Sequence, residues 1–246
     1  MSRVYLVRHG QAGTRKSYDS LSHLGRRQAR MLGDYFVSEK IHFAAAYSGA
    51  LVRQEETAAE VRAAYREAGV CFPEIVREPG WNEFDLTHVY RSLAPLLSAE
   101  DPEFDRDYRE LVAQARAAAE QPDANVNRRW LPCDVKVVEA WIQGRHAYDG
   151  ETWQAFRERV VGCQSKVAPT ERDANIVVFT SATPIGIWTA LAMEIAPEIN
   201  ADRAMRLAGV LHNASITVMR LHNRDLRLHS FNAIPHLGEP ALRTYR

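Results

Sequence analysis

Residues 4–12 read VYLVRHGQA and give the clearest indication of the fold. Its first four residues form a short run of strand-forming, mostly apolar side chains, which predicts a strand covered on both faces. Arg8 and His9 follow directly, so a guanidinium and an imidazole stand at the carboxyl end of the strand. In open α/β sheets ligands bind at that end. Gly10 favours a ligand site further, because glycine lets the backbone approach a ligand closely.

The composition is that of an ordinary globular protein. The chain has 246 residues, of which 46% are hydrophobic and 25% are charged. Lys plus Arg and Asp plus Glu both number 31, so the formal net charge is zero. A balanced charge favours neither nucleic acid nor an anionic membrane as a partner. An anion site therefore has to be built locally from arginines. The sequence leaves the oligomeric state open.

The cysteines and the hydropathy pattern predict a cytoplasmic protein. Cys71, Cys133 and Cys163 are widely spaced, odd in number and form no CxxC pair. This argues against a disulfide framework and against a cysteine zinc site. No apolar run approaches the ~20 residues of a membrane span. The first strand begins almost at Met1, which leaves no room for a signal peptide.

The first third of the chain alternates between strand and helix patterns. Apolar residues recur at helical spacing over 24–36, with Ser22 as the expected N-cap. Residues 41–47, IHFAAAY, predict a second strand. Residues 50–69, ALVRQEETAAEVRAAYREAG, predict a helix that its final glycine closes.

The remaining chain predicts an insertion and a closing hairpin. Residues 86–130 are rich in Ala, Glu, Arg and Tyr, which indicates helices. A buried strand is expected at ANIVVFT, followed by a helix with Thr183 as N-cap and Pro184 at its first position. Residues 214–231 predict a β-hairpin with its turn near Asn223 to Asp225.

Together these elements predict an α/β fold. Strands that alternate with helices indicate a three-layer α/β/α sandwich, and the late hairpin makes the mostly parallel sheet a mixed one. We expect one domain over 1–246. Within it, residues 86–145 form a helical cap insertion over the active-site face.

Arg53 is the second candidate for anion binding. It stands in the first turns of a helix that follows a strand. Helix N-termini attract anions, and a guanidinium adds a planar fork that suits phosphate oxygens. The alternative is a solvated arginine that pairs with Glu56 or Glu60. Tyr18 and Asp19, in the loop after the first strand, either line the mouth of a pocket or form plain surface.

Glu83 is the candidate general acid. In PGWNEFD it stands beside Trp81 and Phe84. A carboxyl group among aromatic rings loses hydration, and the loss favours the protonated form that a general acid needs. Asp85 is the competing carboxylate, and an exposed turn residue is the alternative.

Several motifs, taken together, resemble a known family. VRHGQA, LSHLGRRQA, LVRQEETA, the turn glutamate, NASIT and SFNAIPHL occur in this order from Arg3 to His236. The combination resembles the histidine phosphatase superfamily, which includes phosphoglycerate mutases and many small phosphatases. Residues 86–145 lie outside the recognisable motifs.

The resemblance implies a role for each candidate. His9 is the expected nucleophile, which forms a phosphohistidine. Arg8 and Arg53 clamp the phosphoryl oxygens. Glu83 protonates the leaving alkoxide and then activates water. Gly10 and Gln11, in the same motif as His9, are expected to bind the substrate. The resemblance implies neither a metal nor another cofactor.

The sequence departs from the family in one segment, where Ala182 and Thr183 also stand in place of the family's two glycines. Most members carry a second histidine after a late strand, and here IVVFTSATPIG puts Ser181 there, or Thr180 if the alignment shifts by one residue. The chain thus resembles a subgroup that has a Thr-Ser segment at this place. A hydroxyl can still donate one hydrogen bond to a phosphoryl oxygen. His236 is a candidate to replace the lost histidine, while His212 fits ordinary packing better.

These expectations lead to one main functional hypothesis and two alternatives. The main one is a metal-independent phosphatase that acts on a small phosphorylated metabolite. The second is phosphoryl transfer of the phosphoglycerate mutase type. The third is a binding or regulatory protein that keeps the phosphate site but has lost turnover.

Overall fold

The computed structural model describes residues 2–13, 19–119, 132–167, 173–193, 200–222 and 225–245. The chain divides into two compact units: one consists of Met1–Glu83 and Arg159–Arg246, and the other of Phe84–Glu158. The second unit starts close to the predicted insertion, 86–145, and continues beyond its end. The single domain with a cap over the active-site face stays a prediction.

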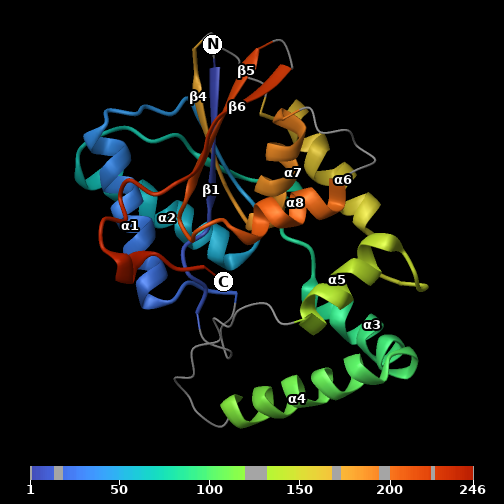
Figure 1. Cartoon of the computed structure of the whole chain (residues 1–246). Helices are drawn as coiled ribbons and strands as arrows, with labels where there is room; N and C mark the ends of the chain where they lie inside the picture. Colours follow the sequence, from blue (N-terminus) through green and yellow to red (C-terminus); the bar gives the residue numbers. More distant parts are fainter. Residues whose placement is uncertain are drawn as a thin grey trace. The chain divides into compact units, whose positions relative to one another are not determined.

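A six-stranded mixed sheet forms the centre of the first unit (Figure 1). Its strands, in spatial order, are β3 (Ile75–Arg77), β2 (Ala45–Ser48), β4 (Asn175–Thr180), β1 (Ser2–Arg8), β5 (Ile216–His222) and β6 (Asp225–Ala233). The pairings from β3 to β1 are parallel, and β5 and β6 are antiparallel to their neighbours. The predicted mixed, mostly parallel sheet is confirmed. The predicted hairpin is confirmed as well, although 223–224 lie outside the described residues.

Helices cover both faces of this sheet. Figure 1 shows α1 (His23–Ser38) and α2 (Val52–Glu67) on one side and α7 (Ala182–Ala192) and α8 (Asn200–Gly209) on the other. Helix α7 packs against β1, β6 and α8. The α/β/α sandwich predicted from the sequence is confirmed.

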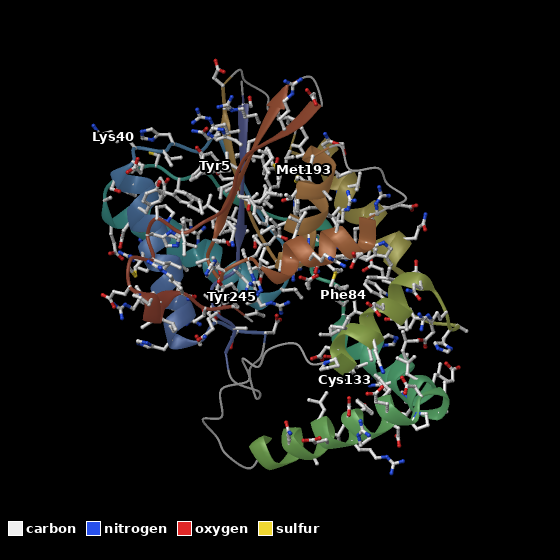
Figure 2. All side chains as sticks on the ribbon, in the orientation of Figure 1. Tyr5, Lys40, Phe84, Cys133, Met193 and Tyr245 are labelled. Carbon is white, nitrogen blue, oxygen red and sulfur yellow. The ribbon has the colours of Figure 1, made fainter. Side chains whose placement is uncertain are left out.

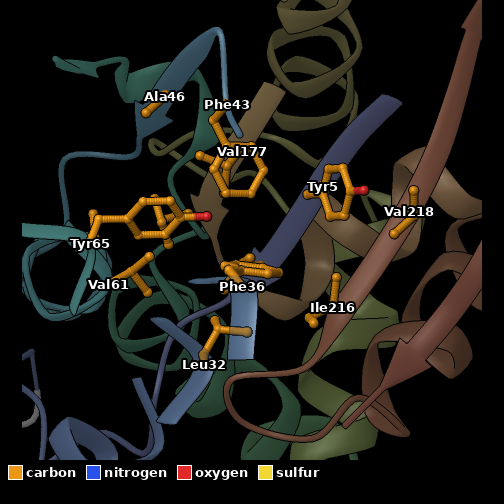
Figure 3. Close-up of a cluster of buried hydrophobic side chains, with 13 residues drawn as sticks. Tyr5, Leu32, Phe36, Phe43, Ala46, Val61, Tyr65, Val177, Ile216 and Val218 are labelled. Carbon is orange, nitrogen blue, oxygen red and sulfur yellow. The ribbon is translucent and has the colours of Figure 1, made fainter. Parts of the chain in front are cut away.

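The strand in VYLVRHGQA is buried on both faces, as its pattern predicts. Tyr5 and Val7 belong to the cluster between the sheet and helices α1 and α2 (Figure 3). The rings of Tyr5 and Phe36 meet edge to face with centroids 6.0 Å apart, an arrangement that aromatic pairs favour. Val4 and Leu6 alternate with this pair, point to the opposite face and are fully buried. Side chains fill the layers on both faces of the sheet (Figure 2).

The predicted ends of α1 and α2 are confirmed. Ser22 is the N-cap of α1, and its Oγ accepts the Gly25 N–H at 3.0 Å. Gly69 follows α2 with a φ of +68°, a conformation that glycine adopts without strain. Both signals depend on residues next to each other in the chain, so the sequence shows them directly.

The second strand begins later than predicted. It spans Ala45–Ser48, whereas the sequence predicts a strand over 41–47. The Ile41 N–H donates to the Phe36 carbonyl at 3.0 Å and so completes the end of α1. Apolar character continues through this segment, but its first residues satisfy a helix end.

The predicted start of α7 is wrong by two residues. The helix begins at Ala182 with Ser181 as N-cap, so Thr183 lies inside its first turn. The Thr183 N–H needs an acceptor there, and Oε2 of Glu83 supplies one at 3.1 Å. Because this acceptor comes from a distant part of the chain, the local cap signal was misleading.

The second unit is helical. It holds α3 (Leu86–Glu100), α4 (Pro102–Ala119) and α5 (Pro132–Gln143). Trp141 stacks on Phe84 with centroids 4.6 Å apart and meets Trp153 edge to face at 5.6 Å. Both tryptophans therefore belong to a core, as the sequence favoured. Across the described ranges of both units, every helix is too short or too polar to cross a membrane.

Candidate active site

The site lies at the carboxyl ends of β1 and β4. Arg8 is the register partner of Thr180, and the His9 N–H donates to the Thr180 carbonyl at 2.9 Å. These parallel strands end side by side, so Ser181, which follows Thr180, is next to His9. The sheet edge that the sequence predicted for a ligand thus brings together the imidazole and the Thr-Ser segment.

His9 is held in one tautomer by its two neighbours. Its Nδ1 lies 2.7 Å from the Gly10 carbonyl, which can only accept, so Nδ1 carries the proton. Its Nε2 lies 3.2 Å from Nε of Arg53, which can only donate, so Nε2 presents a lone pair. His9 is 7% exposed. The ring is therefore a neutral imidazole whose nucleophilic nitrogen faces a guanidinium.

Arg53 connects the histidine to a carboxylate. Besides the bond to His9, its Nη1 lies 2.7 Å from Oδ1 of Asp19. The arginine side chain is only 11% exposed. The alternative of a solvated surface arginine is wrong, because this side chain is largely buried and bonds His9 and Asp19. Arg53 faces inward from the first turn of α2.

Asp19 tethers its loop to the start of α2. Its Oδ2 accepts the Val52 N–H at 3.1 Å while Oδ1 accepts from Arg53. A carboxylate at a helix N-terminus is favoured by the unpaired N–H groups and by the helix dipole. Asp19 therefore lies at the site, whereas its neighbour Tyr18 lies outside the described residues.

Arg8, which precedes His9 in the chain, is anchored by two backbone carbonyls. Its side chain is 6% exposed, and Nη1 donates to the Leu211 carbonyl. Its backbone N–H donates to the Ser215 carbonyl at 3.1 Å. Arg8 thus places a buried guanidinium at the end of β1, and a guanidinium suits a phosphate anion. That it clamps the same anion as Arg53 stays a prediction.

Glu83 and Asp85 have separate tasks. Glu83 accepts the Thr183 N–H at the start of α7, the helix that follows β4. Asp85 is the N-cap of α3 and accepts the His88 N–H at 3.0 Å. The two carboxylates that the sequence left in competition are therefore distinguished: Glu83 belongs to the unit of the strand ends, and Asp85 begins a helix of the other unit.

The two hydroxyls of the Thr-Ser segment differ in what they do with their protons. Thr180 Oγ1 donates to the Trp81 carbonyl at 2.6 Å. Ser181 Oγ instead accepts from Nε2 of Gln54 at 2.8 Å. Both side chains are buried, with exposed fractions of 0% and 1%. A hydroxyl that already donates to a carbonyl is a poor donor to a ligand, so Ser181 is the better candidate.

Gly10 and Gln11 connect β1 to α1. A Cβ on Gly10 would overlap the Gly25 carbonyl of α1, so its close neighbour is a helix rather than a ligand. The Gly10 N–H donates to Thr57 Oγ1 at 3.0 Å. Gln11 Oε1 accepts from the Ser22 hydroxyl at 2.8 Å. For both residues, contact with a substrate stays a prediction.

The two late histidines are both neutral near pH 7. Burial lowers the pKa of His236 to about 4, against a smaller opposing effect of the Ala214 backbone, and its ring lies beside Tyr35. Burial, followed by the charge of Arg8, lowers the pKa of His212 as well. Burial thus favours the neutral form of both rings, and the replacement of the lost histidine by His236 stays a prediction. Substrate binding by His236 stays a prediction.

Sequence reasoning missed two residues of α2. Thr57 accepts the Gly10 N–H and donates to the Arg53 carbonyl at 2.7 Å. Gln54 is fully buried and bonds to Ser181. Thr57 follows Arg53 by four residues and so lies on the same helix face, and this spacing could have indicated that Thr57 belongs to the site. No sequence pattern marks Gln54.

The donor set determines what the site can bind. It offers guanidinium groups, a neutral imidazole and a hydroxyl, which together suit a phosphate group. Within the described ranges, no three His, Cys, Asp or Glu side chains come together in a way that could hold a metal ion.

Comparisons with known proteins agree with this geometry. The family model described as histidine phosphatase superfamily (branch 1) matches residues 4–234. No curated protein matches the chain in sequence.

Solved structures with the same fold include three relatives of low sequence identity. A phosphoglycerate mutase from Bacillus anthracis str. Sterne has a TM-score of 0.59 at 16% identity, with 96% of this chain and 95% of that chain covered. A mutant phosphoserine phosphatase from Entamoeba histolytica, in complex with phosphoserine, has a TM-score of 0.57 at 15% identity, covering 96% and 100%. A mycobacterial glucosyl-3-phosphoglycerate phosphatase has a TM-score of 0.53 at 19% identity, covering 94% and 98%. At these identities the likeness is one of fold.

Proposed function

The chain is an enzyme of phosphatase type that belongs to branch 1 of the histidine phosphatase superfamily, and we propose that it hydrolyses a small phosphorylated metabolite through a phosphohistidine on His9. The reaction needs neither a metal nor another cofactor in this proposal. The observation that carries it is the His9 ring, whose Nε2 lone pair faces the Arg53 guanidinium.

The first step is an in-line attack on phosphorus. The phosphoryl group enters between His9 and Arg53, and its oxygens take the guanidinium hydrogen bonds that Nε2 accepts at rest. The Nε2 lone pair forms the N–P bond as the ester P–O bond breaks. Glu83 donates its proton to the departing alkoxide. The proton stays on Nδ1, which keeps donating to the Gly10 carbonyl, so the ring keeps the tautomer that attack requires.

The second step returns the enzyme to its starting state. Glu83, now ionised, takes a proton from water as the water oxygen attacks phosphorus. The N–P bond breaks, its electron pair returns to Nε2, and inorganic phosphate leaves. Arg8, Arg53 and the Ser181 hydroxyl stabilise the charge on the equatorial oxygens in both steps, which is the main catalytic contribution in phosphoryl transfer.

The structural relatives suggest which phosphate esters to try. One relative holds phosphoserine and another is named for glucosyl-3-phosphoglycerate. We propose a substrate of this kind, a small molecule with a phosphate monoester. We also propose a cytoplasmic location. All three cysteines are free thiols, and Cys71 is exposed, which fits a reducing compartment.

The test is hydrolysis of a generic aryl phosphate by the wild type and by His9→Ala. We expect release of inorganic phosphate from the wild type and its loss in the variant. His42→Ala is the matched control, because His42 is exposed and lies outside the site. Reaction with a labelled phosphate ester, quenched in alkali, should leave an acid-labile adduct on the peptide that holds His9. An adduct on His236 instead would overturn the assignment.

The same assay separates the alternatives. A mutase interconverts phosphoglycerates when it is given the bisphosphate. A binding protein neither hydrolyses the ester nor transfers the phosphoryl group, yet it still takes up an anion. Inactivity of the wild type on aryl phosphate and on the phosphate esters of the relatives would count against the proposal.

A further inference from the structure

We propose that Gln54 is a positioning residue that turns the Ser181 hydroxyl proton toward the phosphoryl group, an inference that rests on the proposed function. Gln54 follows Arg53 in the first turn of α2, yet its side chain is fully buried. A buried amide has to find partners for both its donors and its acceptor. The partners of Gln54 decide how its amide is oriented.

Two backbone groups determine the orientation of this amide. The Leu51 N–H can only donate, and it lies 3.2 Å from Oε1. The Trp81 carbonyl can only accept, and it lies 3.2 Å from Nε2. Nε2 therefore has to be the atom that meets Ser181 Oγ at 2.8 Å. Gln54 donates to the serine and cannot accept from it.

This bond decides where the serine proton can go. A hydroxyl has one proton and accepts with its lone pairs, and Gln54 occupies a lone pair of Ser181. Ser181 is the N-cap of α7, where a serine oxygen usually accepts a helix N–H, but Ser181 makes no such bond. The Thr183 N–H donates to Glu83 instead. Among the described residues no acceptor takes the Ser181 proton.

The neighbouring hydroxyl does not compete for this task. Thr180 gives its proton to the Trp81 carbonyl, the same carbonyl that accepts from Gln54. That carbonyl therefore holds both Thr180 and the Gln54 amide in place. Of the Thr-Ser pair, only Ser181 keeps a proton for a ligand at the end of β4.

The backbone nearby leaves room for this amide. A Cβ on Gly49, at the end of β2, would overlap Oε1 of Gln54. The absence of a side chain at Gly49 therefore creates the space that the amide occupies. The site thus combines a glycine, two backbone groups and a glutamine around one serine hydroxyl.

A double-mutant cycle tests whether Gln54 acts through Ser181. Gln54→Met keeps the length of the side chain and removes the amide. We expect this variant to lower kcat on a generic aryl phosphate by about 10-fold, with KM changed less than about 2-fold, because one oriented hydrogen bond to the transition state is lost. In a Ser181→Ala background the same change should lower kcat by less than about 2-fold.

Two further variants allow the same test if Gln54→Met folds poorly. Gln54→Glu is nearly the same shape, but it puts a carboxyl oxygen in place of Nε2, and this oxygen accepts the Ser181 proton and so reverses the bond. In the wild-type background, Gln54→Glu should lower kcat more than Gln54→Met does. In the Ser181→Ala background, Gln54→Glu should lower kcat no more than Gln54→Met does. Gln28→Met is the matched control, because Gln28 is also fully buried and bonds elsewhere. Its effect should be the same in both backgrounds.

Affinity for orthovanadate separates this inference from the proposed function. If the wild type turns over substrate and Gln54→Met lowers kcat equally in the wild-type and Ser181→Ala backgrounds, the inference fails and the proposed function stands. If the wild type does not turn over any ester, the proposed function fails. The inference then stands only if Gln54→Met weakens orthovanadate binding in the wild type and leaves it unchanged in Ser181→Ala. Equal weakening in both backgrounds would overturn it.

Discussion

Arg53 serves two acceptors at once through two different nitrogens. Its Nε donates to His9 and its Nη1 to Asp19, with both donors in one rigid plane. A lysine ammonium carries its donors on one nitrogen and lacks this planar fork. The identity of the cation at this position therefore matters as much as its charge.

We expect Arg53→Lys to lower kcat/KM by about 10- to 100-fold, because the bidentate contact to phosphoryl oxygens is lost while the charge remains. The measurement is steady-state hydrolysis of an aryl phosphate. Arg26→Lys is the control, because Arg26 pairs with glutamates on the surface. A wild-type kcat/KM in Arg53→Lys would remove Arg53 from the site.

We expect Ser181→Ala to lower kcat by about 10- to 100-fold through loss of one transition-state hydrogen bond. Thermal melting has to be followed in parallel, because Ser181 is buried. The control is Ser165→Ala, because the Ser165 hydroxyl is exposed and bonds to the Gly162 carbonyl at the end of a helix. Unchanged kinetics with unchanged melting would show that Ser181 takes no part in the reaction.

The reverse change, Ser181→His, should lower the melting temperature. Ser181 is 1% exposed and touches Gln54, so an imidazole there overfills the site. Gln54→Ala in the same chain removes the obstructing amide and should restore most of the stability. If Ser181→His alone melts like the wild type, the packing around Gln54 is looser than the contacts indicate.

At the scale of the element, the start of α1 holds the loop that carries His9. Ser22 caps α1 through the Gly25 N–H, and its own hydroxyl donates to Gln11. The Gln11 N–H in turn donates to Gln28 of α1 at 2.8 Å. The cap and the RHG segment are thus one connected structure, in which glycines allow the two backbones to approach.

We expect Ser22→Ala to lower the free energy of unfolding by about 1–2 kcal/mol, because both a helix cap and a side-chain hydrogen bond are lost. Urea denaturation measures the change. Ser38→Ala, at the exposed opposite end of α1, is the control and should cost less. An equal decrease in the free energy of unfolding in the two variants would mean that the cap at Ser22 contributes no more stability than the exposed Ser38 hydroxyl does.

At the scale of the whole molecule, burial of His236 links stability to pH. The pKa of His236 in the folded chain is about 4, below its ordinary value of 6.5. Between these values the unfolded chain binds more protons than the folded one. The stabilising effect is therefore complete above pH 6.5 and is lost as the pH falls toward 4.

We expect the free energy of unfolding to fall by up to about 3 kcal/mol between pH 7 and pH 4 on account of His236. Urea denaturation across this range measures it. In His236→Phe the decrease should be smaller, because the ring no longer titrates, and His42→Gln is the exposed control. The same slope in the wild type and His236→Phe would assign the pH dependence to other groups.

How far the sequence could predict each feature depends on how local its cause is. The strand VYLV, the Ser22 cap and the Gly69 stop arise from neighbouring residues and from the pattern of burial, so they could be read directly. The 41–47 strand and the Thr183 cap have the same local signals. The Thr183 cap failed because a distant group, Glu83, accepts its N–H. The 41–47 strand failed at its start because Ile41 completes the end of the preceding helix, α1, a use that its apolar pattern does not show.

The class of the sheet and the place of Arg8 and His9 at the end of a buried strand follow from the residues alone. The partners that meet at this strand end follow from the packing of distant elements. Arg53 bonds Asp19, 34 residues away, and Gln54 bonds Ser181, 127 residues away. Periodicity and propensity act over a few residues, so they predict strands, helices and caps. The partner of a buried side chain depends instead on which elements the fold brings together, because each buried polar atom needs a hydrogen bond.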